Sequence, residues 1–554
     1  MKKVLVLAPP PTPNGDLHVG HLSGPYLRAD IYKRYCRMRG IATYYLCGAD
    51  EHQSYVRFKG EQIGLSPEGT ADKFTDEIQK TLFAARIEID CFARPRKLPQ
   101  HQLLVNDFFR RLFTTGKLIE KEEECLYCES CNLYLFEAYV SGRCPHCGVP
   151  TNGNACETCG RPNFCHDLRD PHCNKCGRAP ALRRLNRVYM PLAPYEKQLR
   201  QYYDKATISP HIRAVCEQII EQGLPEVPVT HVTDWGIPVP GYQGQRFYVW
   251  FEMAPGLLAA TDELAVMNGE PRGWKRFWKE DDVKIIKFMG FDNGYFYALF
   301  FPAIFHAYDP GIQLPEALIG NEFYRLDNSK FSTSRNHAIW GRDLLKQHNV
   351  DLVRFYLAYS APEAEQTSFT LADFQQVVNR EVLGGVQQWL RELGRRIATY
   401  SHATAPSPAV WTDSHSRFYE YLRQAPVSME LAYGEKSFAT QLAARQLLEL
   451  VRRSNAFGRS EEHWSQVNSR RLTYNTALAL ELAAARLFTI MAAPVMPLFA
   501  ASLWKDLGQT ASLYHAVWPD GMEWLDTGTH ISNLQRKYFE DYGDVETLSH
   551  PVSV

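Results

Sequence analysis

The sequence predicts an α/β protein in which a parallel-sheet domain is split by a cysteine-rich insertion and followed by an all-α C-terminal domain. Three observations predict this class. A strand–turn–helix–strand pattern opens the chain, ten of the fourteen cysteines lie between Cys125 and Cys176, and apolar residues recur at helical spacing from about residue 370. A length of 554 residues is enough for about three or four domains.

The opening pattern predicts the topology of the first domain. A strand is expected at 3–8, a helix at about 18–39 and a second strand from Thr43 to Asp50. Strand, helix and strand in this order form a parallel βαβ unit, whose ligands bind at the carboxyl ends of the strands. Strand-like segments return at 246–256 and 284–296, so the same domain resumes after the cysteines.

The change of pattern along the chain predicts the domain boundaries. The two halves of the parallel-sheet domain are expected at 1–118 and 226–345, the insertion at 119–225, a linker at 346–378 and the helical domain at 379–554, with a loop at 401–410.

Composition limits the class of protein only in part. Lys and Arg total 61 and Asp and Glu total 62, so net charge neither supports nor excludes a nucleic-acid partner. The N-terminal apolar run is too short for a signal peptide, and no stretch approaches the roughly 20 apolar residues of a membrane span. A cytoplasmic protein without a membrane contact is therefore expected.

A pair of histidines follows the first strand. His18 and His21 flank Gly20 in an H-x-G-H pattern, shortly after Asn14. Two imidazoles three residues apart lie on one face of a first helical turn, and a helix N-terminus favours phosphate. The alternatives are half of a metal site or two ordinary surface histidines.

A lysine–serine loop follows a strand-like segment far downstream. It carries Lys330 and Ser332 in the sequence KFSTS, where a lysine can neutralise a leaving pyrophosphate. The alternative is an ordinary solvated loop. An H-x-G-H near the start and a K-x-S-x-S near the end of one split α/β domain together favour nucleotide chemistry.

These two patterns resemble the HIGH and KMSKS signatures of class I aminoacyl-tRNA synthetases. The segments ADIYKRYCRMRG, LCGADEH, WGIPVP, FYVWFE, GFDN and KFSTSR resemble the methionyl branch of that family in order and spacing. The resemblance implies a split Rossmann-like catalytic domain, ATP and Mg²⁺, formation of an aminoacyl-adenylate, and transfer of the acyl group to tRNA. It also implies that 346–378 contacts the tRNA stem.

The resemblance assigns residues to these steps. Adenylate formation is assigned to His18, His21, Lys330 and Ser332, and ATP binding to Asn14, Gly20, Gly290, Asp292 and Lys330. Asp292 matches the ribose contact of the family, and the alternative is that it caps the following helix.

Four C-x-x-C pairs predict two structural zinc sites. The pairs are Cys128/Cys131, Cys144/Cys147, Cys156/Cys159 and Cys173/Cys176, and two pairs complete one tetrahedral Cys₄ site. Spacing leaves the pairing open, and disulfides are the alternative. The family resemblance implies that the two inner pairs bind one zinc and the two outer pairs bind the other. Cys125 and Cys165 receive no role.

The amino-acid pocket combines family residues with departures from the family. Asp50 is expected to bind the substrate α-ammonium, and Trp250 matches a pocket tryptophan, with a core tryptophan as the alternative. The remaining predicted wall residues are Pro10, Thr12, Met253, Leu257, Asn293 and Tyr297. Five of these differ from the usual methionine pocket (Pro10, Thr12, Met253, Leu257 and Tyr297), which leads to the hypothesis that methionine is a poor substrate.

The helical domain carries a weaker resemblance. Trp464 matches the tryptophan on which the family stacks an anticodon base, and the alternative is a core tryptophan. Gly384, Gly385 and Gln387 stand where asparagines are usual, so altered anticodon recognition is expected. The predicted partners are an amino acid, ATP and tRNA, and the chain is expected to be a monomer. Two other functions stay open: a biosynthetic paralogue with another acid or acceptor, and an inactive tRNA-binding protein.

Overall fold

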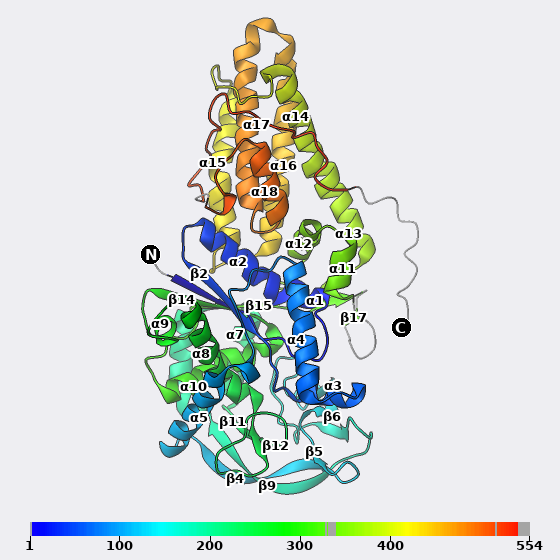
Figure 1. Cartoon of the computed structure of the whole chain (residues 1–554), viewed down its shortest axis with the longest axis vertical. Coiled ribbons are helices and arrows are strands. Elements are labelled where there is room, and N and C mark those ends of the chain that lie inside the picture. Colours follow the sequence, from blue (N-terminus) through cyan, green and yellow to red (C-terminus); the bar gives the residue numbers. More distant parts are fainter. Residues whose placement is uncertain (1–2, 327–328, 331–338, 516–517, 541–554) are drawn as a thin grey trace.

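The computed structural model describes residues 3–326, 329–330, 339–515 and 518–540. The molecule is elongated, with a helical domain at one end, a parallel sheet in the middle and the cysteine-rich insertion at the other end (Figure 1). The predicted fold class is confirmed.

A six-stranded parallel sheet forms the centre of the chain. Its order is β10-β15-β14-β1-β2-β3. The strands are β1 (Lys3–Leu7), β2 (Thr43–Gly48), β3 (Cys91–Ala93), β10 (Thr207–Ile208), β14 (Val283–Gly290) and β15 (Ala317–Asn321). The chain leaves the centre in one direction from β1 to β3 and in the other from β14 to β15. The switch point between β1 and β14 is therefore where a ligand is expected at the carboxyl ends.

Alternate residues of the central strands face two hydrophobic layers. Val4 and Val6 of β1 belong to a core that continues through α2 (Leu27–Met38) and α12 (Val350–Tyr359) into the helical domain. Leu5 and Leu7 belong to the second core, and both cores are buried. Period-2 alternation explains why each face of this sheet is covered by helices.

Short and long helices complete the two layers. They are α1 (Val19–His21), η1 (Leu22–Tyr26), α3 (Ser54–Ile63), α4 (Pro67–Ala84), η2 (Pro95–Lys97), α5 (Pro99–Thr114), η3 (Ala193–Tyr195), α6 (Glu196–Lys205), α7 (Pro210–Gln222), α8 (Val249–Met267), α9 (Lys275–Trp278), η4 (Phe291–Asn293), η5 (Phe296–Phe300) and α10 (Phe301–Tyr308). The helix expected at about 18–39 is thus a short α-turn, a π-helical turn and then α2.

One strand prediction is wrong. The segment 246–256 contributes only its first residues to β13 (Gln245–Phe247), and α8 begins at Val249. Its apolar run reads as a strand by composition, but fifteen of the nineteen residues of α8 are buried, so both faces of this helix are apolar. A helix that is buried on all sides has no amphipathic period, so its sequence does not distinguish it from a buried strand.

The insertion is built from short antiparallel sheets. One has the order β11-β9-β4-β5, with β4 (Ile119–Cys128), β5 (Leu133–Tyr134), β9 (Ala181–Pro191) and β11 (Glu226–Pro228). The other has the order β7-β6-β8, with β6 (Glu137–Arg143), β7 (Pro150–Gly153) and β8 (Arg169–Cys173). A hairpin of β12 (Thr230–Val232) and β13 follows, and β10, which comes before it in the chain, has already joined the central sheet.

A small sheet precedes the helical domain. Its order is β17-β16-β18, with β16 (Tyr324–Leu326), β17 (Ser329–Lys330) and β18 (Thr367–Phe369). The backbone of the predicted catalytic Lys330 pairs with Arg325 in this sheet. Ser332 and Thr333 lie outside the described residues. Helix α11 (Gly341–Gln347) follows the loop.

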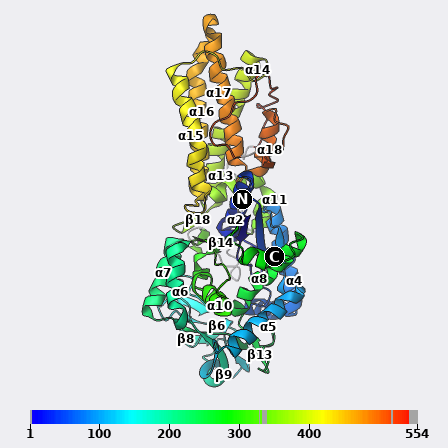
Figure 2. The same ribbon diagram turned by 90° about the vertical axis from the view of Figure 1, so that its left-hand side faces the viewer.

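The C-terminal region is a helical domain, as predicted. It comprises α13 (Leu371–Val377), η7 (Val378–Gln387), α14 (Gln388–Ser401), α15 (Asp413–Tyr433), α16 (Thr440–Glu461), η8 (Glu462–Gln466), η9 (Asn468–Arg470), α17 (Arg471–Ala492), α18 (Pro497–Asp506) and η10 (Leu513–His515). Figure 2 shows α15, α16 and α17 as a nearly parallel bundle standing on the sheet domain. Residues 468–492 form a run long and apolar enough to cross a membrane, but 89% of the 18-residue apolar window within it is buried inside the protein.

Candidate active site

The two predicted histidines cap one another at the carboxyl end of β1. His18 is the N-cap of α1, and its Nδ1 accepts a hydrogen bond from the backbone N–H of His21 at 3.3 Å. The backbone N–H of His18 donates to Nδ1 of His21, also at 3.3 Å, and the rings stack with centroids 3.7 Å apart. A neutral imidazole that accepts at Nδ1 carries its proton on Nε2. Burial lowers the pKa of His21 to about 4, so this ring is neutral at pH 7.

The histidine turn is held by the segment that follows the lysine–serine loop. The backbone N–H of Val19 donates to the carbonyl of Ile339 at 3.1 Å, and that of Gly341 donates to the carbonyl of Leu17 at 2.8 Å. A β-bridge also joins His18 to Trp340. Residues 339–341 thus lie against the histidine turn although more than 300 residues separate them in sequence.

The end of β14 faces the same switch point. Asp292 comes two residues after Gly290, and a Cβ on Gly290 would lie 2.5 Å from Oδ1 of this aspartate, so a larger residue would displace the Asp292 side chain. Burial raises the pKa of Asp292 to about 6. Asn293 donates from Nδ2 to Oδ1 of Asp292 at 3.0 Å. Asn293 therefore orients the carboxyl group of Asp292, which is predicted to bind the ribose.

A cavity lies beside these groups, between the ends of β1 and β2 and one face of α8. We call it the amino-acid cavity; it has an empty volume of about 520 Å³, part of it open to solvent. Four predicted pocket residues line it: Pro10, Asp50, Met253 and Leu257. Burial and the neighbouring carboxylates of Glu252 and Glu137 raise the pKa of Asp50, which makes no ion pair among the described residues. A substrate ammonium group would supply the missing charge.

Two further predicted residues lie just behind the wall of this cavity. The Trp250 ring stacks on Phe296 with centroids 3.6 Å apart, and the Tyr297 hydroxyl donates to Sδ of Met253 at 3.2 Å. The ammonium group of Lys287 lies 3.9 Å from the centroid of the Tyr297 ring. Met253 is therefore held in one position by Tyr297. Thr12 is half-buried and does not line the cavity.

The sequence did not reveal one polar cluster at the cavity wall. Oε1 of Glu252 lies 2.7 Å from Nδ1 of His52 and 2.8 Å from Nε2 of His101. Burial alone would raise the pKa of Glu252, but the two histidines outweigh it and lower the value to about 2. The three residues come from three separate elements, and Gly256 leaves the room that His101 needs. No spacing pattern in the sequence connects them.

Comparison with known proteins identifies the family. The model of the class I tRNA synthetases (M) matches residues 4–391. Methionine–tRNA ligases from Christiangramia forsetii and Thermomicrobium roseum are 31% and 32% identical over 514 residues, which is 91% of this chain and 74% and 86% of theirs. The chain belongs to the class I tRNA synthetases of the methionyl type.

The fold of this synthetase agrees with a solved relative. The structure of Mycobacterium tuberculosis methionyl-tRNA synthetase in complex with methionyl-adenylate superposes with a TM-score of 0.77 at 20% identity, covering 96% of this chain and 98% of that one. The family prediction made from the two signatures, and with it the assignment as a ligase, is confirmed.

The eight paired cysteines of the synthetase form two four-thiol clusters. Cys128, Cys131, Cys173 and Cys176 make one, and Cys144, Cys147, Cys156 and Cys159 make the other. Four Sγ–Sγ distances of 3.5, 3.6, 3.8 and 3.9 Å fit a tetrahedron with metal–sulfur bonds of about 2.3 Å, whose edges are about 3.8 Å. No disulfide joins any of the fourteen cysteines, all of which lie in the described residues, which supports the prediction of metal sites over that of disulfides.

Each of the four cysteine turns uses the same backbone device. The residue after the second cysteine has a positive φ: 51° at Asn132, 76° at Gly148, 70° at Gly160 and 73° at Gly177. This left-handed conformation returns the chain sharply and is tolerated by glycine and asparagine. A C-x-x-C-[G/N] pattern was therefore the sequence signal for closed metal-binding turns.

In the helical domain of the synthetase, the predicted residues Trp464 and Gln387 have different surroundings. Trp464 lies in η8, at the connection between α16 and α17 that Figure 1 shows at the distal end of the domain. Its ring is half-buried, its Nε1 donates to Glu461 at 2.9 Å, and Arg470 lies over its face. Oε1 of the buried Gln387 accepts from the backbone N–H groups of Tyr538 and Phe539, both at 2.9 Å. Gln387 thus holds the C-terminal segment.

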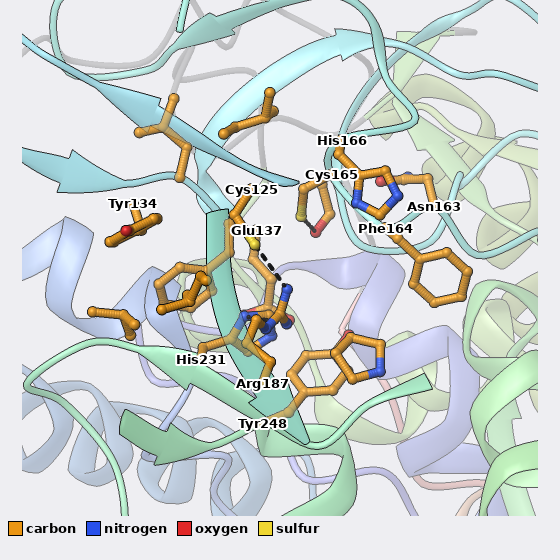
Figure 3. Close-up of a pocket in the computed structure, with 17 residues that line it drawn as sticks. Cys125, Tyr134, Glu137, Asn163, Phe164, Cys165, His166, Arg187, His231 and Tyr248 are labelled. Carbon is orange, nitrogen blue, oxygen red and sulfur yellow. Dashed lines mark hydrogen bonds between the residues drawn. The ribbon is translucent and has the colours of Figure 1, made fainter. Parts of the chain in front are cut away.

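A second cavity lies between the insertion and the start of α8, and we call it the insertion cavity (Figure 3). It has an empty volume of about 540 Å³. Cys125 and Cys165, which lack a place in the metal clusters, both line it. Arg187 donates from Nη1 to Sγ of Cys125 at 3.6 Å, drawn as the dashed line in Figure 3.

Proposed function

We propose that this synthetase activates an amino acid with ATP and transfers it to tRNA, as a methionine–tRNA ligase. The observation that carries the proposal is the mutually capped histidine pair at the switch point of the sheet, beside a cavity with a buried, unpaired Asp50. The names of the relatives supply the tRNA and the amino acid.

The phosphate chemistry uses the histidine pair and the lysine loop. A carboxylate oxygen of the amino acid attacks the α-phosphorus of ATP, the bond from that phosphorus to the bridging oxygen breaks, and pyrophosphate leaves. His18 and His21 donate from Nε2 to the α-phosphate oxygens, where negative charge increases in the transition state. Lys330 stabilises the departing pyrophosphate together with Mg²⁺ brought by ATP, and Ser332 belongs to the same loop. Asn14 precedes the two histidines and Gly20 lies between them, and both contact the ATP.

The remaining groups position the two substrates. Ionised Asp292 accepts a hydrogen bond from a ribose hydroxyl, and Gly290 lets the nucleotide approach the backbone. Asp50 binds the α-ammonium group, so the carboxylate points toward the histidines. In the second step a terminal hydroxyl of tRNA attacks the acyl carbon, and AMP leaves. We propose Trp464 as a stacking surface for an unpaired base of that tRNA.

Zinc fits the two thiol clusters. Closed Cys₄ sites are structural, and the thiolates would hold two zinc ions away from the reacting atoms. Such sites need a reducing compartment. We therefore propose that the enzyme is located in the cytoplasm. We further propose that it is a monomer and has no membrane partner.

One observation favours a second candidate function. Met253 fills part of the side-chain wall with its own thioether, fixed by Tyr297. A wall remodelled in this way fits a synthetase paralogue that adenylates an acid other than methionine or uses an acceptor other than tRNA.

ATP–pyrophosphate exchange with each amino acid in turn, followed by charging of total tRNA, separates these functions. Methionine-dependent exchange with charging of methionine tRNA supports the first. Exchange with another amino acid, or exchange without charging, supports the second. Absence of exchange with every amino acid rejects both and leaves an inactive tRNA-binding protein.

A further inference from the structure

The insertion cavity is lined by two buried ionisable groups that make no ion pair among the described residues. Arg187 is 6% exposed and makes no ion pair with a carboxylate in the described part of the chain. Its three nitrogens donate instead to the carbonyl of Thr230, to Cys125 and to Nδ1 of His231. Glu137 is 2% exposed and likewise makes no ion pair with a described cation. Burial raises the pKa of Glu137 to about 8, so this carboxyl is mostly protonated at pH 7, and an ammonium group beside it would favour the ionised form.

Two hydrogen-bonding atoms of the same cavity have no hydrogen-bond partner in the part of the chain that the structure describes. Oε2 of Glu137 accepts from the Ser54 hydroxyl at 2.9 Å, but its Oε1 is buried and unpartnered. Nδ1 of His231 accepts from Arg187 at 3.0 Å, so the ring carries its proton on Nε2, which is also buried and unpartnered. The cavity therefore offers an unpartnered carboxyl oxygen of Glu137 and an unpartnered donor of His231 next to the Arg187 guanidinium.

These two ends are complementary to a zwitterion. A ligand with an ammonium group would satisfy Glu137, and its carboxylate would accept from His231 beside the Arg187 guanidinium. Between them the wall is largely apolar and includes Phe136 and Phe164, and Figure 3 shows Phe164 on one side of the cavity and His231 with Arg187 on another. Its empty volume of about 540 Å³ is close to the value of about 520 Å³ for the amino-acid cavity.

We infer that the insertion cavity is a second binding site, distinct from the amino-acid cavity, for a small zwitterion such as a free α-amino acid or a dipeptide. The site goes beyond the proposed aminoacylation, which uses Asp50. Two contacts connect the insertion cavity with elements that form the amino-acid cavity. Ser54, which donates to Glu137, begins the helix four residues after Asp50, and the His231 ring packs edge-on against Tyr248, which precedes α8.

Titration calorimetry on the zinc-loaded full chain tests the site. The Asp50→Asn background removes the anchor of the amino-acid cavity, so remaining binding reports the insertion cavity. The probes are L-methionine, L-alanine and glycylglycine, with methylamine and acetate as half-ligands. We expect one site for at least one zwitterion and none for the half-ligands.

Two variants then address the ligand contacts. In the Asp50→Asn background, Glu137→Gln and His231→Phe should each weaken binding at least about tenfold, because each removes a charge-assisted or buried hydrogen bond. Glu137→Gln is isosteric, and His231→Phe keeps a ring against Phe136 and Tyr248. Glu129→Gln, exposed on the same insertion and outside the cavity, is the matched control and should change nothing.

Two results would overturn the inference. One is the absence of zwitterion binding by the Asp50→Asn protein up to about 10 mM. The other is binding that both cavity variants leave unchanged. Pyrophosphate exchange by the native protein is measured separately, so failure of the second site and failure of the proposed aminoacylation give different outcomes.

Discussion

Replacing Arg354 by methionine should destabilise the junction between the helical domain and the sheet domain. Arg354 is 1% exposed, and Nη2 pairs with Asp30 at 2.7 Å. The guanidinium also donates to the carbonyls of Ala85, Pro494 and Val495 at 2.9–3.0 Å. It therefore joins the end of α4 and helix α2 to the turn between α17 and α18.

The contacts allow an estimate of the loss. Breaking a buried ion pair by removing one partner costs about 3–5 kcal/mol. Asp30 keeps Arg34 at 2.8 Å and the backbone N–H of Glu88 at 2.8 Å, which favours the lower end. The buried carbonyls that lose a donor add about 1 kcal/mol each. We expect Arg354→Met to lower the free energy of unfolding by about 6 kcal/mol, from about 3 kcal/mol for the ion pair and about 1 kcal/mol for each of the three carbonyls.

Urea denaturation followed by tryptophan fluorescence and circular dichroism measures this loss. The matched control is Arg452→Met, whose guanidinium is 58% exposed and pairs with Glu381 at 3.0 Å; an exposed pair contributes at most about 1 kcal/mol. If Arg354→Met and Arg452→Met unfold at the same urea concentration with equal slopes, the buried network does not stabilise the domain junction and our reasoning is wrong.

Three further predictions concern the active site and the metal clusters. His21→Ala and Lys330→Ala should each slow pyrophosphate exchange at least about 100-fold while ATP affinity changes much less, because both act where transition-state charge develops; near-normal exchange in both would reject the mechanism. The KM for ATP should fall as pH rises through about 6, where the buried Asp292 ionises and can accept the ribose hydroxyl; an identical profile in Asp292→Asn would contradict this role. Metal analysis should find two zinc ions per chain, and a content of one or none in the native protein would exclude the two-zinc structure. The Cys144→Ala variant should bind one zinc ion fewer, and limited proteolysis should show that its insertion is unfolded.

Local patterns in the sequence were sufficient to predict the family and the cysteine turns. The H-x-G-H turn is specified within a few residues, since the two histidines cap each other through their own backbone. The C-x-x-C pairs are equally local, because each pair with its following glycine or asparagine forms one closed turn. Features whose geometry depends on neighbours in sequence can be predicted from sequence.

The buried helix α8 shows where this reasoning fails. Its residues 249–256 were predicted as strand because an apolar run without amphipathic period fits either element. The environment that decides for a helix is the apolar face of the sheet on one side and α5 and α10 on the other, all distant in sequence.

The sequence by itself determined the signatures, the cysteine pairs and the order of domains. Only the tertiary structure decided how the parts of the site meet. Contacts between separate elements produce three features. They bring the inner cysteine pairs together and the outer pairs together, they place His52 and His101 at Glu252, and they leave Glu137 and His231 each with an unpartnered atom among the described residues. The physical reason is that burial, desolvation and the absence of a counter-charge are properties of a residue's surroundings, and those surroundings come from segments far apart in the chain.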